Sequence, residues 1–173
     1  MTTTTRHTEE SRPMPVPSTP SPTADREIIM SRVVSAPREL VFDVWTDPVH
    51  VAQWWGPNGF SIKVHEMDVR PGGTWRFLMT GPDGTEWPNR VTFREVKRPE
   101  RLAYLHDSDV DNDPRAFEVT VTFEAQGEKT KVSMLSVFPT VEACNYVKSF
   151  GAVELGKQTL AKLDAFVQRV QAR

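Results

Sequence analysis

Two histidines and an asparagine stand at positions where side chains are expected to turn inward. By strand alternation, His65, Asn89 and His106 each share a face with apolar neighbours. An imidazole exchanges a proton near neutral pH, and an asparagine amide donates to a carbonyl oxygen, so these groups suit acid/base chemistry in a cavity. The alternative is that each polar group is satisfied by the backbone inside an ordinary core. No nucleophile motif accompanies them, so the catalytic residues are unknown and enzyme activity is left open.

Large apolar side chains form the second candidate set, because a ligand cavity is walled mainly by such groups. Aromatic and sulfur-containing side chains alternate along residues 74–80, and a second alternating run begins at Phe117. A third group flanks the stretch 54–60, where it would form a lid or a mouth. That these side chains simply fill a core stays an open alternative. The candidate ligand-binding residues are therefore Trp54, Trp55, Phe60, His65, Trp75, Phe77, Met79, Asn89, His106 and Phe117.

Metal ligands and phosphate-binding loops are not evident in the sequence. The four histidines are scattered and Cys144 is the only cysteine, so linear spacing excludes a zinc site and Cys144 is predicted to be a core residue. The acidic run 107–113 resembles a calcium loop in its aspartate spacing, with Glu118 at the twelfth position. However, Asn112 stands where that loop has glycine, and the flanks indicate strands. We predict a solvated hairpin loop that binds calcium at most weakly, with no metal site and no cofactor.

The elements that position these residues follow from changes in hydrophobic period. Apolar residues recur at every second position in seven segments and at helical spacing in the rest. Asp47 is expected to cap a helix that begins at Pro48, and Gly151 to separate two helices. The predicted strands are 27–35, 62–69, 74–80, 89–96, 101–106, 117–123 and 131–137, and the predicted helices are 37–46, 48–54, 140–150 and 153–170.

The order of these elements predicts the architecture. Six consecutive strands joined by short turns indicate an antiparallel sheet. One face of such a sheet must be covered, and the C-terminal helix is the only element long enough to cover it. The fold class is therefore α+β, a helix-grip in which a curved antiparallel sheet of about seven strands and two short helices wrap around a long C-terminal helix.

Composition divides the chain of 173 residues into two parts. Residues 1–25 contain five of the 14 prolines and no aromatic residue, which predicts a disordered tail, whereas residues 26–173 contain all the aromatic residues and form one domain. A formal net charge of −2 gives no basic excess for nucleic acid, and no apolar run is long enough for a membrane span. A single cysteine and the lack of a signal-peptide pattern favour a cytoplasmic protein.

Four sequence segments resemble the START/Bet v 1-like superfamily, and within it the branch named for the activator of Hsp90 ATPase. They are SAPRELVFDVWTDPVHVAQWWGPNGF, VRPGGTWRF with the following MTGPDG, RPERLAY and GAVELGKQTLAKLDAF. The resemblance covers residues 27–170. It implies the same helix-grip fold and a deep apolar cavity between the sheet and the long helix, which some branches use to bind, cyclise or hydrolyse hydrophobic molecules.

The expected function is binding of a small hydrophobic or aromatic molecule in an interior cavity, with cyclase- or hydrolase-type turnover left open. The alternative, implied by the namesake of the branch, is a chaperone-associated protein that acts through its surface. The expected partner is therefore a small hydrophobic ligand, without nucleic acid or membrane. A homodimer and a chaperone partner stay open.

Overall fold

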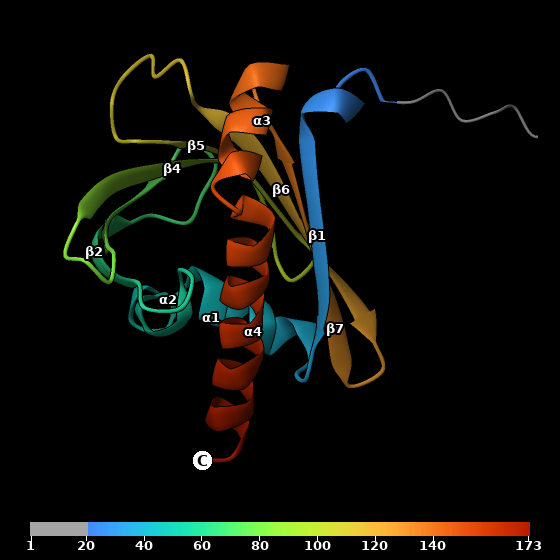
Figure 1. Ribbon diagram of the computed structural model, residues 1–173. Helices are drawn as coiled ribbons and strands as arrows, with labels where there is room; N and C mark the ends of the chain where they lie inside the picture. The colour runs from blue at the N-terminus through green and yellow to red at the C-terminus, as the bar shows by residue number, and fades with distance from the viewer. Residues whose placement is uncertain (1–20) are drawn as a thin grey trace, which may run out of the picture.

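The computed structural model describes residues 21–173 and shows a curved sheet wrapped around a long helix (Figure 1). The seven strands are β1 (Glu27–Val34), β2 (Ser61–Met67), β3 (Thr74–Thr80), β4 (Glu86–Lys97), β5 (Arg101–Asp107), β6 (Phe117–Gln126) and β7 (Lys129–Val137). The helices are η1 (Ala24–Arg26), α1 (Arg38–Thr46), α2 (Pro48–Trp54), α3 (Val141–Ser149) and α4 (Ala152–Gln171). The predicted α+β helix-grip is confirmed.

All seven strands belong to one antiparallel sheet in the order β1-β7-β6-β5-β4-β3-β2. Hairpins join β2 to β7 in sequence, whereas α1 and α2 connect the two edge strands, β1 and β2. Asp47 caps α2 as predicted, since its carboxylate accepts hydrogen bonds from the backbone N–H groups of Val49 and His50. In space, α1 and α2 lie along one half of α4, and α3 lies at its other end (Figure 1).

The predicted tail, residues 1–25, lies mostly outside the described residues. Of its last five residues, Ala24 and Asp25 belong to the 3₁₀ turn η1, so regular structure starts slightly before the predicted boundary at residue 26. The hydroxyl of Ser21 donates to the Glu27 carboxylate at 3.1 Å, which ties this turn to the start of β1. Within residues 21–173, no helix is both long and apolar enough to cross a membrane.

Strand β4 extends beyond its neighbour β5 at one end. It pairs with β3 from Glu86 onward, but its pairing with β5 begins only at Arg90. Pro88 lies in this overhang, where β4 has no partner on the β5 side, and a proline without an N–H is tolerated at such a local edge. This overhang leaves Trp87 more than half exposed, at 55%, and carries Asn89 to the end of the sheet nearest α3.

The main core contains four of the five tryptophans. Trp45, Trp54, Trp55 and Trp75 pack edge to face in a chain, with ring centres 4.9–5.5 Å apart between successive members. This cluster lies between the α1–α2 pair, the sheet and the buried face of α4. Aromatic rings in this arrangement bury large apolar areas and interact favourably beyond that burial. This half of the sheet interior is therefore filled with side chains.

Helix α3 has its own small core. Its buried Cys144, predicted to be a core residue, packs with Ile28 and Phe138 in a cluster separate from the main one. Gly151 adopts a left-handed φ of 76° between α3 and α4, as the predicted break requires. The turn redirects the chain, so that α3 covers the end of the sheet instead of extending α4.

A buried carboxylate fastens α4 to the end of β1. Asp164 is 8% exposed, and it accepts hydrogen bonds from the Ser35 backbone N–H at 2.9 Å and from the Arg32 guanidinium at 3.2 Å. Burial raises the pKa of Asp164, but hydrogen bonds from Ser35, Gln168 and Arg32 outweigh it and place that pKa below its ordinary value. The ionised form is therefore the one that the fold stabilises.

Replacing this carboxylate should lower stability. Asp164→Asn is expected to reduce the free energy of unfolding by about 2 kcal/mol, because the charge-assisted bonds are lost and Arg32 is left without its partner. Asp43→Asn is the matched control, since Asp43 pairs with Arg98 at 2.9 Å on an exposed surface, where such pairs contribute about 0–1 kcal/mol. Urea unfolding at neutral pH measures both, and equal losses would contradict this assignment.

Candidate ligand-binding site

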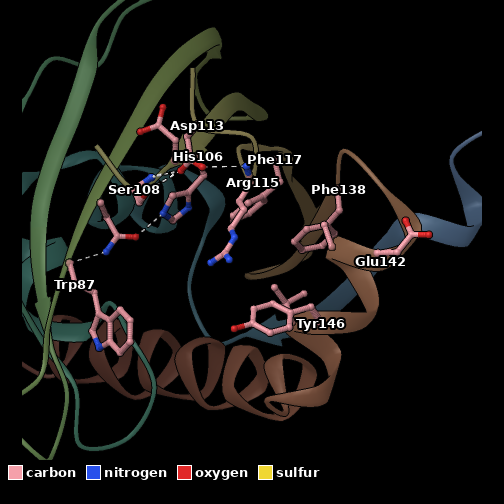
Figure 2. A pocket seen from close by; sticks show the side chains of 13 residues that line it. Trp87, His106, Ser108, Asp113, Arg115, Phe117, Phe138, Glu142 and Tyr146 are labelled. Atoms are coloured by element: carbon pink, nitrogen blue, oxygen red, sulfur yellow. Dashed lines mark hydrogen bonds between the residues drawn. The ribbon is translucent and has the colours of Figure 1, made fainter. Parts of the chain in front are cut away.

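A pocket of about 770 Å³ lies between α3 and the ends of β4, β5 and β6 (Figure 2). Its size falls within the usual range of small-molecule sites. The walls come from the β4 overhang, the strand pair β5–β6, the acidic loop that joins these two strands, and α3. The residues that line it are Trp87, Asn89, His106, Asp107, Ser108, Asp113, Arg115, Phe117, Phe138, Glu142, Ala143, Tyr146 and Val147.

One wall is a row of three nearly parallel rings. The His106 and Phe117 rings stack with centres 4.9 Å apart, and Phe117 stacks on Phe138 at the same centre distance. The sheet register produces this row, because His106 of β5 pairs directly with Phe117 of β6, and Phe138 follows β7. Rings fixed in this way form an apolar wall that exists before any ligand arrives.

The opposite wall is the face of α3 that carries Ala143, Tyr146 and Val147. The Tyr146 side chain is half exposed, at 51%, and the Arg115 guanidinium lies 5.5 Å from the centre of its ring. Figure 2 shows Arg115 extending from the side of the sheet toward Tyr146. A guanidinium over an aromatic face is an attractive cation–π contact. Arg115 thus links the loop before β6 to α3 at the rim of the pocket.

Asn89 and His106 form a hydrogen-bonded pair in the pocket wall. Asn89 donates its amide N–H to the Trp87 carbonyl at 2.9 Å, and its Oδ1 lies 2.7 Å from Nε2 of His106. Because the amide oxygen only accepts, the His106 ring must carry its proton on Nε2. The second ring nitrogen, Nδ1, is then an acceptor. This geometry defines one tautomer of a neutral histidine.

Burial keeps this histidine uncharged at neutral pH. It lowers the pKa of His106 to about 4, although the nearby Asp107 carboxylate acts in the raising direction. The uncharged form favoured by burial works against a role for His106 as a general acid or base at neutral pH. One of the two amide N–H groups of Asn89 is bound to the Trp87 carbonyl, which leaves a single N–H for any other acceptor. The pair offers hydrogen bonding more readily than acid/base catalysis.

Of the ten candidate residues from the sequence, the pocket brings together Asn89, His106 and Phe117. Trp54 and Trp55 lie in the tryptophan core instead of at a mouth, and the Trp54 indole N–H donates to the Val44 carbonyl at 3.0 Å. The elbow packs directly onto the sheet, so no opening is left there. The other five lie outside the pocket as well: Trp75 and Phe77 are core residues, Met79 packs against the core, Phe60 is half-buried and His65 is exposed on β2.

The acidic loop after β5 is held by arginines. Arg90 binds Asp107 at 3.0 Å and Asp111 at 2.9 Å, and Arg76 binds Asp109 at 2.8 Å. These contacts direct three carboxylates of the calcium-like spacing toward guanidinium groups. Within the part of the chain that the structure describes, no three His, Cys, Asp or Glu side chains are grouped to hold a metal ion. The loop instead braces the sheet beside the pocket.

A helix-grip fold with a pocket between its sheet and its helices defines the START/Bet v 1-like class of proteins. Within this class, residues 35–168 match the family model described as activator of Hsp90 ATPase homolog 1-like protein, and the chain belongs to that family. The resemblance seen in the sequence is thereby confirmed. No curated protein matches the chain.

Solved structures from several bacteria share the fold. Protein NE0264 from Nitrosomonas europaea has 22% sequence identity and a TM-score of 0.77, covering 87% of this chain and 99% of its own. Protein CV1439 from Chromobacterium violaceum has 27% identity and a TM-score of 0.68, covering 82% and 96%. The AHSA1 protein from Silicibacter pomeroyi has 20% identity and a TM-score of 0.67, covering 82% and 97%. These similarities support the architecture along nearly the whole length of the relatives.

Proposed function

We propose that this protein binds a small apolar or aromatic molecule in the pocket beneath α3. The observation that carries the proposal is the preformed row of His106, Phe117 and Phe138, which faces a cavity of about 770 Å³. A largely apolar cavity with a few placed polar groups is the usual form of a small-molecule site. The neutral Asn89–His106 pair supplies such a polar group without introducing a charge.

The pocket supports binding more strongly than turnover. Burial favours the neutral form of His106 across the physiological range, and one of the two Asn89 amide N–H groups is engaged by the backbone. A general base is most effective when its pKa lies near the working pH, which is not the case here. We therefore propose a carrier, sensor or sequestering role for the pocket in preference to a hydrolytic one.

Isothermal titration with 2-methoxynaphthalene tests the proposal. This flat, uncharged probe is expected to bind at one site per chain with a Kd of about 10–100 μM. It should also raise the melting temperature, because a ligand that binds only the folded state stabilises it. Absence of both saturable heat and thermal stabilisation would contradict the proposal.

Association with a chaperone is the second candidate, taken from the family's description. The observation that favours it is a set of exposed apolar side chains where α3 meets α4, namely Tyr146, Phe150 and Val153. Exposed apolar groups that lie together favour contact with another protein. The same titration separates the two candidates, because a protein that acts only through this surface has no saturable site for a small apolar probe.

A further inference from the structure

We propose that the ligand of this pocket carries a hydroxyl group of the phenol or enol type, which donates a hydrogen bond to Nδ1 of His106. The inference rests on the proposed function and adds the chemistry of the ligand. It follows from the bonding of one ring nitrogen and the environment of the other.

The orientation of the His106 ring is fixed from the sheet side. Nε2 lies 2.7 Å from Asn89 Oδ1, and Asn89 is itself held by its bond to the Trp87 carbonyl. On its face, the His106 ring is stacked against Phe117. Tilting the ring would lose the stacking on Phe117, and a half-turn within the same plane would lose the bond to Asn89. The position and the proton of Nε2 are thus set before a ligand enters.

The other nitrogen is left for a ligand. Among residues 21–173, Nδ1 of His106 has no hydrogen-bond partner. In this part of the chain, the fully buried side-chain nitrogens that lack a hydrogen-bond partner are His50 Nδ1 and Trp75 Nε1. His106 Nδ1 is not among them, so it is not fully buried. Nδ1 therefore keeps some accessible surface, and the pocket is the recess that His106 lines. An acceptor lone pair is thus available to a bound molecule.

The chemistry of this lone pair selects a donor. A neutral imidazole nitrogen accepts a hydrogen bond, whereas a carboxylate or an ether oxygen placed against it has no proton to share. A buried acceptor without a partner costs free energy, so a ligand lacking a donor loses affinity at this site. The aromatic row beside His106 favours a hydroxyl attached to a flat unsaturated ring over one on a sugar or a polar chain.

A matched pair of probes tests the inference. 2-Naphthol and 2-methoxynaphthalene have the same ring system, but only the first has a donor. We expect 2-naphthol to bind the wild-type protein about 3- to 10-fold more tightly. His106→Phe keeps an aromatic ring in the row and removes the acceptor, so its two affinities should become equal. Nitrogen NMR of the wild-type protein provides a second measurement: 2-naphthol should shift the His106 Nδ1 resonance more than the ether does.

The outcomes separate this inference from the proposed function. Equal binding of the two probes to the wild-type protein would overturn the hydroxyl assignment and leave the pocket as a general apolar site. A preference for 2-naphthol that persists in His106→Phe would also overturn it, because the donor would then bind elsewhere. If neither probe binds, the proposed function itself fails. Should His106→Phe not fold, the Nδ1 resonance decides alone, and an equal response to both probes contradicts the inference.

Discussion

Val147→Trp is expected to weaken the binding of 2-methoxynaphthalene by more than about 30-fold, which corresponds to a loss of about 2 kcal/mol. Val147 lies on the face of α3 that lines the pocket, opposite the aromatic row. An indole at this position projects into the space that the ligand would occupy. Val147 also packs against the small core of Ile28, Phe138 and Cys144, so the larger side chain is expected to lower the free energy of unfolding by about 1–3 kcal/mol, the usual cost of overpacking. The titration is therefore carried out under conditions where the variant is folded.

Val49→Trp is the matched control for this variant. It makes the same replacement on α2, at a side chain that is 69% exposed and outside the pocket. Its affinity for the probe should equal that of the wild-type protein in the same titration. Unchanged binding by Val147→Trp, with the fold intact, would place the ligand somewhere else.

Acid is expected to destabilise the protein through His106. In the unfolded chain this group protonates near its ordinary pKa of 6.5, but in the folded protein burial lowers the pKa to about 4. Between these two values the unfolded state binds a proton that the folded state does not. The contribution is fully present above pH 6.5 and is lost as the pH falls toward 4. At about 1.4 kcal/mol per pH unit, the loss attributable to His106 reaches about 3 kcal/mol.

Urea unfolding at a series of pH values measures this loss. Carboxylates also titrate near pH 4, so the informative quantity is the difference in unfolding free energy between the wild-type protein and His106→Phe. Between pH 7 and pH 4, the wild-type protein should lose up to about 3 kcal/mol more unfolding free energy than His106→Phe loses. Parallel curves over this range would show that His106 is solvated in the folded protein, and the description of the pocket wall would be wrong.

The elements of the fold could be predicted from the sequence because each has a strong local signal. Apolar alternation in β3 and β6, the Asp47–Pro48 helix start and the left-handed Gly151 all depend on neighbours within a few positions. Alternation also predicted that Asn89 and His106 point inward. Their mutual hydrogen bond could not be predicted, because it depends on the register between β4 and β5.

The location of the pocket was harder to predict because burial and cavity lining look alike in a sequence. Trp75 and Phe77 have the pattern of a cavity wall, but the α1–α2 pair packs onto them and closes the space. Tyr146 and Val147 line the pocket only because α3 turns away from α4 at Gly151. Trp87 was missed because its strand was predicted to begin at Asn89, whereas β4 begins earlier and overhangs β5.

Intermolecular nuclear Overhauser effects between bound 2-methoxynaphthalene and the protein test the central claim most directly. We expect contacts from the probe to the ring protons of Phe117 and Phe138 and to the methyl group of Ala143, which line opposite walls of the pocket. Contacts to the buried rings of Trp55 and Trp75 should be absent, because that part of the interior is filled. Contacts to those tryptophans, without contacts to Phe117 and Ala143, would contradict the assignment of the site.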